Sequence, residues 1–211
     1  MKPEDWTTPP PGPGWVSHGG REVYRTPWIV VEEHPCTAPT GRPATYGVVR
    51  FQNLAIAVLP LFPDGSTLLV GQHRFALGTY SWELPEGGSP LADDPLEGAR
   101  RELREETGLV AERWIKAFEL ELSNSVTDER AVGYIALDLT QAEAEPDPTE
   151  QLSLRRLPFR QALRLAREGV LKDVMTVAML YQVYHMAEEG ELPADLTARL
   201  LSRETPHADA S

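Results

Sequence analysis

Residues 85–109, PEGGSPLADDPLEGARRELREETGL, contain clear signals for the start and the end of a helix. Asp94 is a good N-cap residue, Pro95 suits the first helical position, and Glu97 follows the cap by three residues. Gly108 is typical of the residue that terminates a helix. Together these signals predict a helix that begins at Pro95 and ends just before Gly108.

The predicted helix, 95–107, has an apolar face and an acidic face. At about 100° per residue, three apolar residues share one stripe that should face the core: Leu96, Ala99 and Leu103. An adjacent stripe carries three acidic residues at the spacing i, i+3, i+4: Glu102, Glu105 and Glu106. Like charges this close destabilise a helix by a few tenths of a kcal/mol per pair, so something must offset them.

Two explanations of the acidic stripe stay open at this point. Three arginines of the helix could form ion pairs, which would make it an ordinary solvated face: Arg100, Arg101 and Arg104. Alternatively the carboxylates bind hard cations, since Mg²⁺ and Mn²⁺ prefer carboxylate oxygens. Spacing alone favours ion pairs. The preceding Glu86-Gly87-Gly88, interpreted as a tight turn after a strand, can present backbone groups beside the helix and shifts the balance toward a metal site.

Outside this segment the chain is strand-rich first and helix-rich later. Apolar and β-branched runs predict strands over 21–33, 45–51, 54–62, 67–72, 80–84, 114–122, 131–139 and 152–157. Pro63-Asp64-Gly65 predicts a hairpin turn between the third and fourth of these strands. Helical spacing and terminal glycines predict further helices over 159–168 and 171–189.

Length and composition fit a globular protein of 211 residues, one domain with additional arms. A formal net charge of -12 argues against nucleic-acid binding but permits a phosphate substrate if a metal supplies local positive charge. The single cysteine, Cys36, favours a reducing compartment. No apolar run approaches the roughly 18 residues of a membrane span, and the N-terminus does not resemble a signal peptide. We expect a cytoplasmic protein without nucleic-acid or membrane partners.

The helix and its flanks resemble the signature of the Nudix hydrolases. That signature is Gly, five residues, Glu, seven residues, Arg-Glu, an aliphatic, any residue, Glu-Glu, any residue, Gly and an aliphatic. The residues in register are Gly87, Arg101, Glu102, Leu103, Glu105, Glu106, Gly108 and Leu109. Asp93 departs from the pattern, because it stands where the signature has Glu. The resemblance extends over residues 20–186 and is closest to the branch that hydrolyses ADP-ribose and other nucleotide sugars.

The resemblance implies an α+β fold, an α/β/α sandwich built on a Nudix-like mixed sheet, with an N-terminal antiparallel β-sheet arm. We expect a disordered Pro/Gly-rich arm over 1–14, a dimerisation sheet over 15–52, the Nudix domain over 53–202 and a loose tail over 203–211. Because the sheet is exchanged between subunits in that branch, a homodimer is expected.

The resemblance also implies a metal site for Mg²⁺ or Mn²⁺. Three carboxylates would bind the ions: Glu102, Glu106 and, in a supporting role, Glu105. The backbone carbonyl of Glu86 would complete the site, and Arg101 would orient the glutamates. Catalysis further requires a general base within reach of the attacking water. Glu150 is the best positional match for that base, and the alternatives are Asp147 and Glu145.

Four residues are candidates for substrate binding. Arg74, in a run that resembles the branch's Gln-x-Arg strand end, could bind a phosphate or form a surface salt bridge. Trp28 could stack on a nucleobase or pack in the core or a dimer interface. Gly88 could contact the substrate through its backbone amide and carbonyl groups. Glu129 ends the segment SNSVTDE, which matches the branch's Ser-Pro-Gly loop except that Asn124 and Ser125 replace Pro and Gly.

The resulting prediction is a metal-dependent hydrolase that cleaves a nucleoside diphosphate derivative. ADP-ribose or another nucleotide sugar is the favoured substrate, and a nucleoside monophosphate and a sugar phosphate are the products. The alternatives are a Nudix-type nucleoside triphosphate pyrophosphohydrolase, a prenyl-diphosphate isomerase and a non-catalytic nucleotide-sensing module, because one fold serves many activities.

Overall fold

A computed structural model of the chain describes residues 12–143 and 151–202. The chain forms two compact units. One unit extends to Gln52 and also includes Ser123–Asp128, and the other consists of Asn53–Leu122 and the chain from Glu129 onward. Most of the expected N-terminal arm, 1–14, and all of the expected tail, 203–211, lie outside the described residues.

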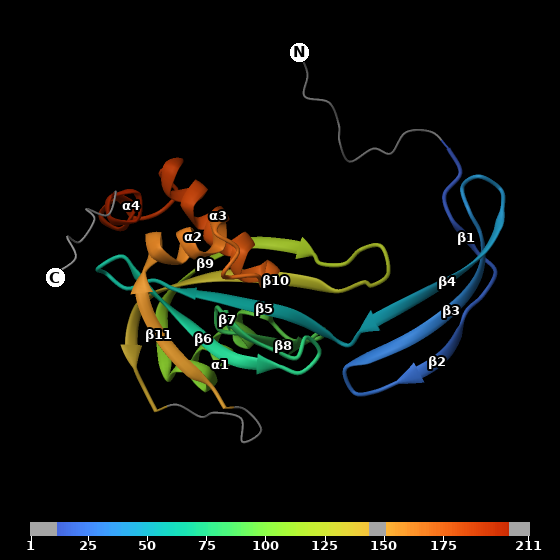
Figure 1. Cartoon of the computed structure of the whole chain (residues 1–211), viewed down its shortest axis with the longest axis horizontal. Coiled ribbons are helices and arrows are strands. Elements are labelled where there is room, and N and C mark those ends of the chain that lie inside the picture. The colour runs from blue at the N-terminus through green and yellow to red at the C-terminus, as the bar shows by residue number, and fades with distance from the viewer. Residues whose placement is uncertain (1–11, 144–150, 203–211) are drawn as a thin grey trace, which may run out of the picture. The chain divides into compact units, whose positions relative to one another are not determined.

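The first unit is an antiparallel sheet built around one long strand (Figure 1). Its strands are β1 (Val16–Ser17), β2 (Arg21–Arg25), β3 (Ile29–Thr37) and β4 (Pro43–Phe51). β3 pairs with the other three strands. The single strand predicted over 21–33 is therefore two strands, because the chain reverses at Thr26, whose hydroxyl accepts hydrogen bonds from the amides of Trp28 and Ile29.

The second unit contains a mixed four-stranded sheet in the order β8-β5-β10-β9 and a three-stranded sheet in the order β11-β6-β7. The strands of the first sheet are β5 (Asn53–Pro60), β8 (Glu86–Pro90), β9 (Leu109–Glu121) and β10 (Arg130–Gln141). Those of the second are β6 (Ser66–Arg74), β7 (Thr79–Glu83) and β11 (Ser153–Pro158). The mixed character comes from β5 and β10, which pair in parallel.

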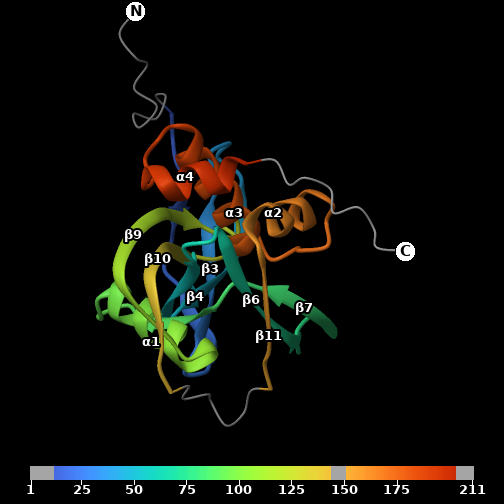
Figure 2. The ribbon, with the colours of Figure 1, turned by 90° about the vertical axis from the view of Figure 1, so that its left-hand side faces the viewer.

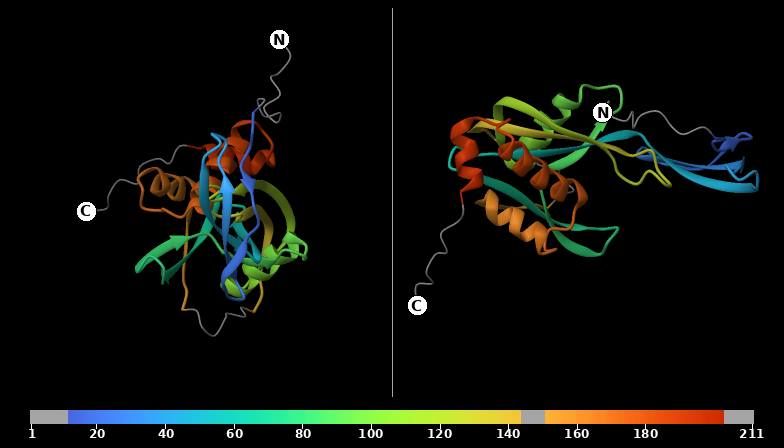
Figure 3. Two further views of the ribbon diagram at one scale, coloured as in Figure 1. Left: turned by 90° about the vertical axis from the view of Figure 1, so that its right-hand side faces the viewer. Right: turned by 90° about the horizontal axis from the view of Figure 1, so that it is seen from above.

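The described residues of this unit also form four helices: α1 (Pro95–Thr107), α2 (Phe159–Arg167), α3 (Val174–Glu188) and α4 (Ala194–Leu201). Successive side chains of β5 point to opposite faces. Ile56 packs in a cluster with Leu103 of α1, whereas Leu59 packs in a cluster with Leu180 of α3 and Leu200 of α4. The sheet is therefore sandwiched between α1 and the C-terminal helices (Figures 2 and 3). This arrangement confirms the predicted α+β sandwich.

The bounds predicted for α1 agree with the structure, and the reason is visible at both ends. Asp94 Oδ1 accepts a hydrogen bond from the Leu96 amide at 2.9 Å, a cap that contributes about 1 kcal/mol. Gly108 adopts φ 67° and its amide donates to the Arg104 carbonyl. Within the described part of the chain, no helix combines the length and apolar character needed to cross a bilayer.

A further local prediction is also wrong. Glu86-Gly87-Gly88 was expected to form a tight turn, but it belongs to β8, which pairs with β5 from Asn53↔Pro90 to Ala57↔Glu86. Glycines weaken a strand and are used where another group approaches the backbone closely. Gly87 fits that description, because Glu102 of α1 approaches its backbone closely.

Candidate active site

The acidic stripe of α1 faces the backbone of β8. A Cβ atom added to Gly87 would lie only 2.2 Å from the carboxyl carbon of Glu102. The missing side chain of Gly87 therefore makes room for that carboxylate. Glu102 and Glu106, one helical turn apart, are each only 7% exposed. Two of the three predicted metal ligands are thus buried between the helix and the strand.

The Glu106 carboxylate contacts the same strand one residue earlier. Its Oε2 accepts a hydrogen bond of 3.0 Å from the backbone amide of Glu86. This amide holds the Glu106 carboxylate beside residue 86, whose carbonyl was predicted to complete the metal site. The carboxylates of Glu102 and Glu106 are consequently positioned by the backbone of β8 at Gly87 and Glu86, rather than by solvent.

Arg101 connects the helix to the strand. One of its terminal nitrogens donates to the Gly88 carbonyl and to Glu102 Oε1, both at 2.7 Å. The other donates to Glu105 Oε2 at 2.8 Å. Arg100, by contrast, pairs with Glu97 on the exposed face. Ion pairs therefore offset part of the charge of the acidic stripe, as the first explanation predicted, while Glu102 and Glu106 are buried against the strand.

The residues between α1 and β8 fit a bound divalent cation. All the side-chain donors on this stripe are carboxylate oxygens, the ligands that Mg²⁺ and Mn²⁺ prefer. The space opposite Glu102 is one that any Cβ at position 87 would fill. Glu102, Glu105 and Glu106 would hold the cation, and the Glu86 peptide would flank it.

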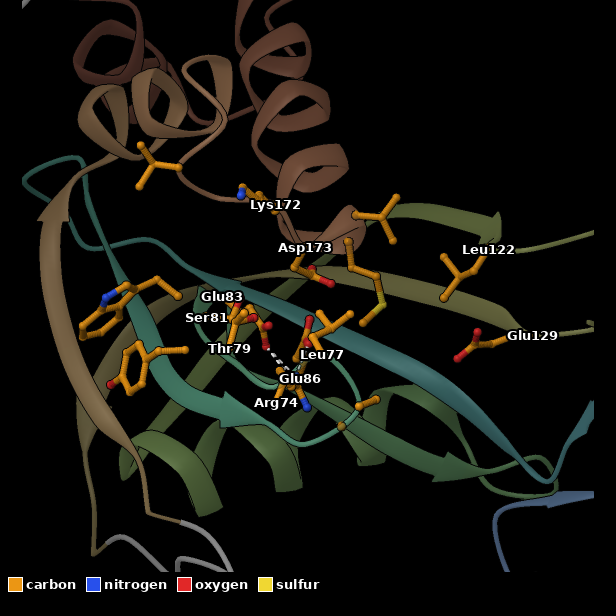
Figure 4. Close-up of a pocket in the computed structure, with 17 residues that line it drawn as sticks. Arg74, Leu77, Thr79, Ser81, Glu83, Glu86, Leu122, Glu129, Lys172 and Asp173 are labelled. Atoms are coloured by element: carbon orange, nitrogen blue, oxygen red, sulfur yellow. Dashed lines mark hydrogen bonds and ion pairs between the residues drawn. The ribbon is translucent and has the colours of Figure 1, made fainter.

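A cavity of about 810 Å³ lies in the second unit, among β6, β7, β8 and the start of α3. Figure 4 shows Arg74, Glu83, Glu86 and Asp173 gathered at one place in it. Glu129 also lines the cavity, apart from this group, and burial raises the pKa of its carboxyl.

Arg74 is paired with two carboxylates in this cavity. Its Nε donates to Glu83 Oε2 at 2.9 Å, and a terminal nitrogen contacts Glu86 Oε1. Desolvation works against the charged guanidinium, but Glu83 and Glu86 outweigh it and raise the pKa of Arg74. The alternative reading of Arg74 as a salt-bridge residue is thus observed, although the ion pair is half-buried rather than on the surface.

Sequence analysis missed two acidic residues of the cavity, Glu83 and Asp173. Together with the side chain of Glu86, they form a group of carboxylates whose ligand atoms lie within 4.8 Å of one another. Asp173 caps α3 by accepting the Thr176 amide at 2.7 Å. An Asp three residues before a Thr predicts such a cap, but no local signal places it beside Glu83. Burial, followed by the charges of Asp173 and Glu83, raises the pKa of Glu86.

The other candidates lie elsewhere. Trp28 belongs to the first unit, between β2 and β3, and is 66% exposed. Gly88 contributes its carbonyl to Arg101. Glu150, the predicted general base, and its alternatives, Asp147 and Glu145, lie outside the described residues.

Known families match most of the chain. Residues 52–176, more than half of it, match the NUDIX domain, and residues 15–49 match the nucleoside diphosphate sugar hydrolase N-terminal domain. The chain therefore belongs to the Nudix family, whose hydrolases need a divalent metal. The family indicated by the resemblance is confirmed, and so is the prediction of a Nudix-type pyrophosphatase.

Individual relatives agree with this assignment. The chain is 28% identical over 158 residues to an ADP-ribose pyrophosphatase of Mycobacterium tuberculosis, covering 73% of this chain and 76% of that protein. It is 29% identical over 140 residues to an ADP-ribose pyrophosphatase of Bacillus subtilis, covering 65% and 75%. A crystal structure of an ADP compounds hydrolase superposes with a TM-score of 0.77 at 20% identity, over 87% of this chain and 100% of that one, and shows the same fold.

Proposed function

We propose that this Nudix hydrolase cleaves the diphosphate of ADP-ribose or a related nucleotide sugar, releasing a nucleoside monophosphate and a sugar phosphate. The observation that carries the proposal is the burial of Glu102 and Glu106 against the Gly87 and Glu86 backbone. The named activity of two ADP-ribose pyrophosphatases that cover most of this chain supports the choice of substrate.

In this proposal Mg²⁺ or Mn²⁺ is held by Glu102 and Glu106, with support from Glu105 and the Glu86 carbonyl. A bound divalent cation screens phosphate charge and lowers the pKa of a bound water. Arg101 keeps Glu102 and Glu105 in place through its contacts of 2.7 and 2.8 Å. In this proposal the glutamates therefore serve as metal ligands in a fixed arrangement, rather than as proton donors.

The remaining proposed roles rest on the family resemblance and, for Arg74 and Trp28, on the chemistry of their side chains. Glu150 would remove the proton of the attacking water, with Asp147 or Glu145 as its substitutes. Glu129 and the backbone of Gly88 would contact the substrate, and Arg74 would bind a phosphate through the donors that Glu83 and Glu86 leave available. Trp28 would stack on the nucleobase.

Turnover of purified protein with ADP-ribose tests the proposed reaction. We expect AMP and ribose 5-phosphate with Mg²⁺ or Mn²⁺, no product after chelation with EDTA, and recovery when the metal is restored. Reaction in ¹⁸O-labelled water, followed by mass spectrometry of both products, identifies the phosphorus that is attacked. A metal-supplemented screen in which no nucleoside diphosphate derivative is cleaved would refute the proposal.

We further propose that residues 15–52 form a dimerisation subdomain beside a catalytic domain over 53–202, in a cytoplasmic homodimer. The first unit exposes several large apolar side chains, as interaction surfaces do: Trp15, Val16, Val23, Tyr24 and Trp28. Analytical ultracentrifugation at micromolar concentration should give twice the mass of one chain, and Val23→Asp should shift it toward one chain. A wild-type monomer would contradict the dimer, while Glu97→Gln serves as a control that alters charge outside this surface.

A further inference from the structure

We propose that the side chains of Glu83, Glu86 and Asp173 form a second divalent-cation site, distinct from the carboxylates of α1. The three residues come from β7, β8 and the residue before α3, and their ligand atoms lie within 4.8 Å of one another. Oxygen atoms around one Mg²⁺ or Mn²⁺ ion are separated by distances in this range, since each lies about 2.0 to 2.2 Å from the metal. Figure 4 shows the group facing the cavity.

Glu86 supplies the observation that points to a ligand. Its side chain is only 7% exposed, and its Oε2 atom is buried without a hydrogen-bond partner among the described residues. A buried polar atom without a partner is unfavourable, more so in a charged group, and commonly indicates an ion or a water at that place. A cation beside Oε2 would satisfy this atom.

The charge balance of the cavity also favours a cation. These three carboxylates share the guanidinium of Arg74, which contacts Glu83 and Glu86, and even with Lys172, which also lines the cavity, their negative charge exceeds the positive charge. Buried charges need compensation by opposite charge or by a metal. Asp173 uses Oδ2 to cap the Thr176 amide, so capping leaves its Oδ1 for another partner. Glu83, Glu86 and Asp173 all line this cavity, and water within it could complete the coordination of a hard cation.

The two cation sites are joined through one residue. The Glu86 amide contacts the Glu106 carboxylate of α1, whereas the Glu86 side chain lies with Glu83 and Asp173. A cation in the cavity would also offset the negative charge of a wall that otherwise repels anions. We therefore expect this chain to bind a divalent cation in addition to the ions held by the signature helix.

Manganese binding without substrate separates the two sites. The full-length Glu102→Gln/Glu106→Gln variant removes the charges of the α1 ligands, and we expect it still to bind one Mn²⁺ per chain, counted by electron paramagnetic resonance of the unbound ion. Adding Asp173→Asn or Glu86→Gln should weaken that binding at least tenfold. Asparagine remains a good N-cap, and glutamine retains the size of Glu86, so both variants should fold. Glu97→Gln, added instead, should change nothing.

Diffraction from crystals soaked in Mn²⁺ gives an independent readout, with an anomalous peak expected among Glu83, Glu86 and Asp173. The inference is overturned if the Glu102→Gln/Glu106→Gln variant binds no Mn²⁺, if its binding is unchanged by Asp173→Asn and by Glu86→Gln, or if the peak is absent. No substrate takes part in these measurements. A negative result therefore leaves the proposed hydrolysis standing, and failure to hydrolyse ADP-ribose leaves this site standing.

Discussion

Replacement of Glu106 by glutamine is expected to lower kcat for ADP-ribose by about 100-fold or more without unfolding the protein. A catalytic metal contributes several kcal/mol to transition-state stabilisation, and about 1.4 kcal/mol corresponds to a factor of ten in rate. Glutamine removes the negative charge that would hold the cation. Its side-chain carbonyl can still accept the hydrogen bond from the Glu86 amide, so the contact between α1 and β8 should persist.

Steady-state kinetics with Mg²⁺ titrated into each variant measure this effect. The matched control is Glu97→Gln, which removes the same charge from the exposed face of the same helix, where Glu97 pairs with Arg100. Its kcat should stay within about twofold of the wild-type value, since an exposed ion pair contributes little. Wild-type kcat and metal affinity in Glu106→Gln would exclude Glu106 as a metal ligand.

Gly87→Ala is expected to have an effect of similar size through geometry alone. The added Cβ would lie 2.2 to 2.4 Å from the carboxylate atoms of Glu102, far inside van der Waals contact. Either Glu102 leaves its position, which would disrupt the metal ligands, or α1 moves away from β8. A misplacement of about 1 Å in a catalytic group can cost on the order of 100-fold in rate.

The neighbouring Gly88→Ala provides the comparison, because its Cβ would approach no closer than 3.4 Å to Asn53. We expect it to cost less than about tenfold, as its backbone contact to Arg101 can be retained. Metal titrations of both variants, with thermal melts, distinguish lost metal binding from lost stability. Equal activities in Gly87→Ala and Gly88→Ala would show that the close approach of Glu102 is not required.

The parts of the fold that were predicted well carry their signals locally. Asp94, Pro95 and Gly108 define the ends of α1 within 15 residues of sequence, and the structure uses Asp94 and Gly108 as caps. Helix α4, which follows Pro193 and has no side-chain cap, was missed because its eight residues offer no comparable start signal. Strand β8 was mistaken for a turn because its two adjacent glycines are more common in turns than in strands.

The residues of the candidate site also differ in whether the sequence could predict them. Glu102 and Glu106 could be selected from helical spacing and family resemblance, because one helix places them together. Glu83 and Asp173 could not, since they are 90 positions apart and meet only when α3 packs near β7. The ion pair of Arg74 with Glu83 and Glu86 is likewise a product of tertiary structure, although its possibility was considered from the sequence.

The contacts of Arg101 affect how the enzyme binds and releases divalent cations. Its guanidinium neutralises part of the Glu102 and Glu105 charge and fastens both to the Gly88 carbonyl. Small zinc domains unfold when stripped of metal, because coordination supplies their folding energy. Here the clusters on both faces of the sheet consist of apolar side chains and include none of the α1 carboxylates. We therefore expect the fold to persist when the ion is chelated, so that occupancy of the site follows the free concentration of the ion around the protein.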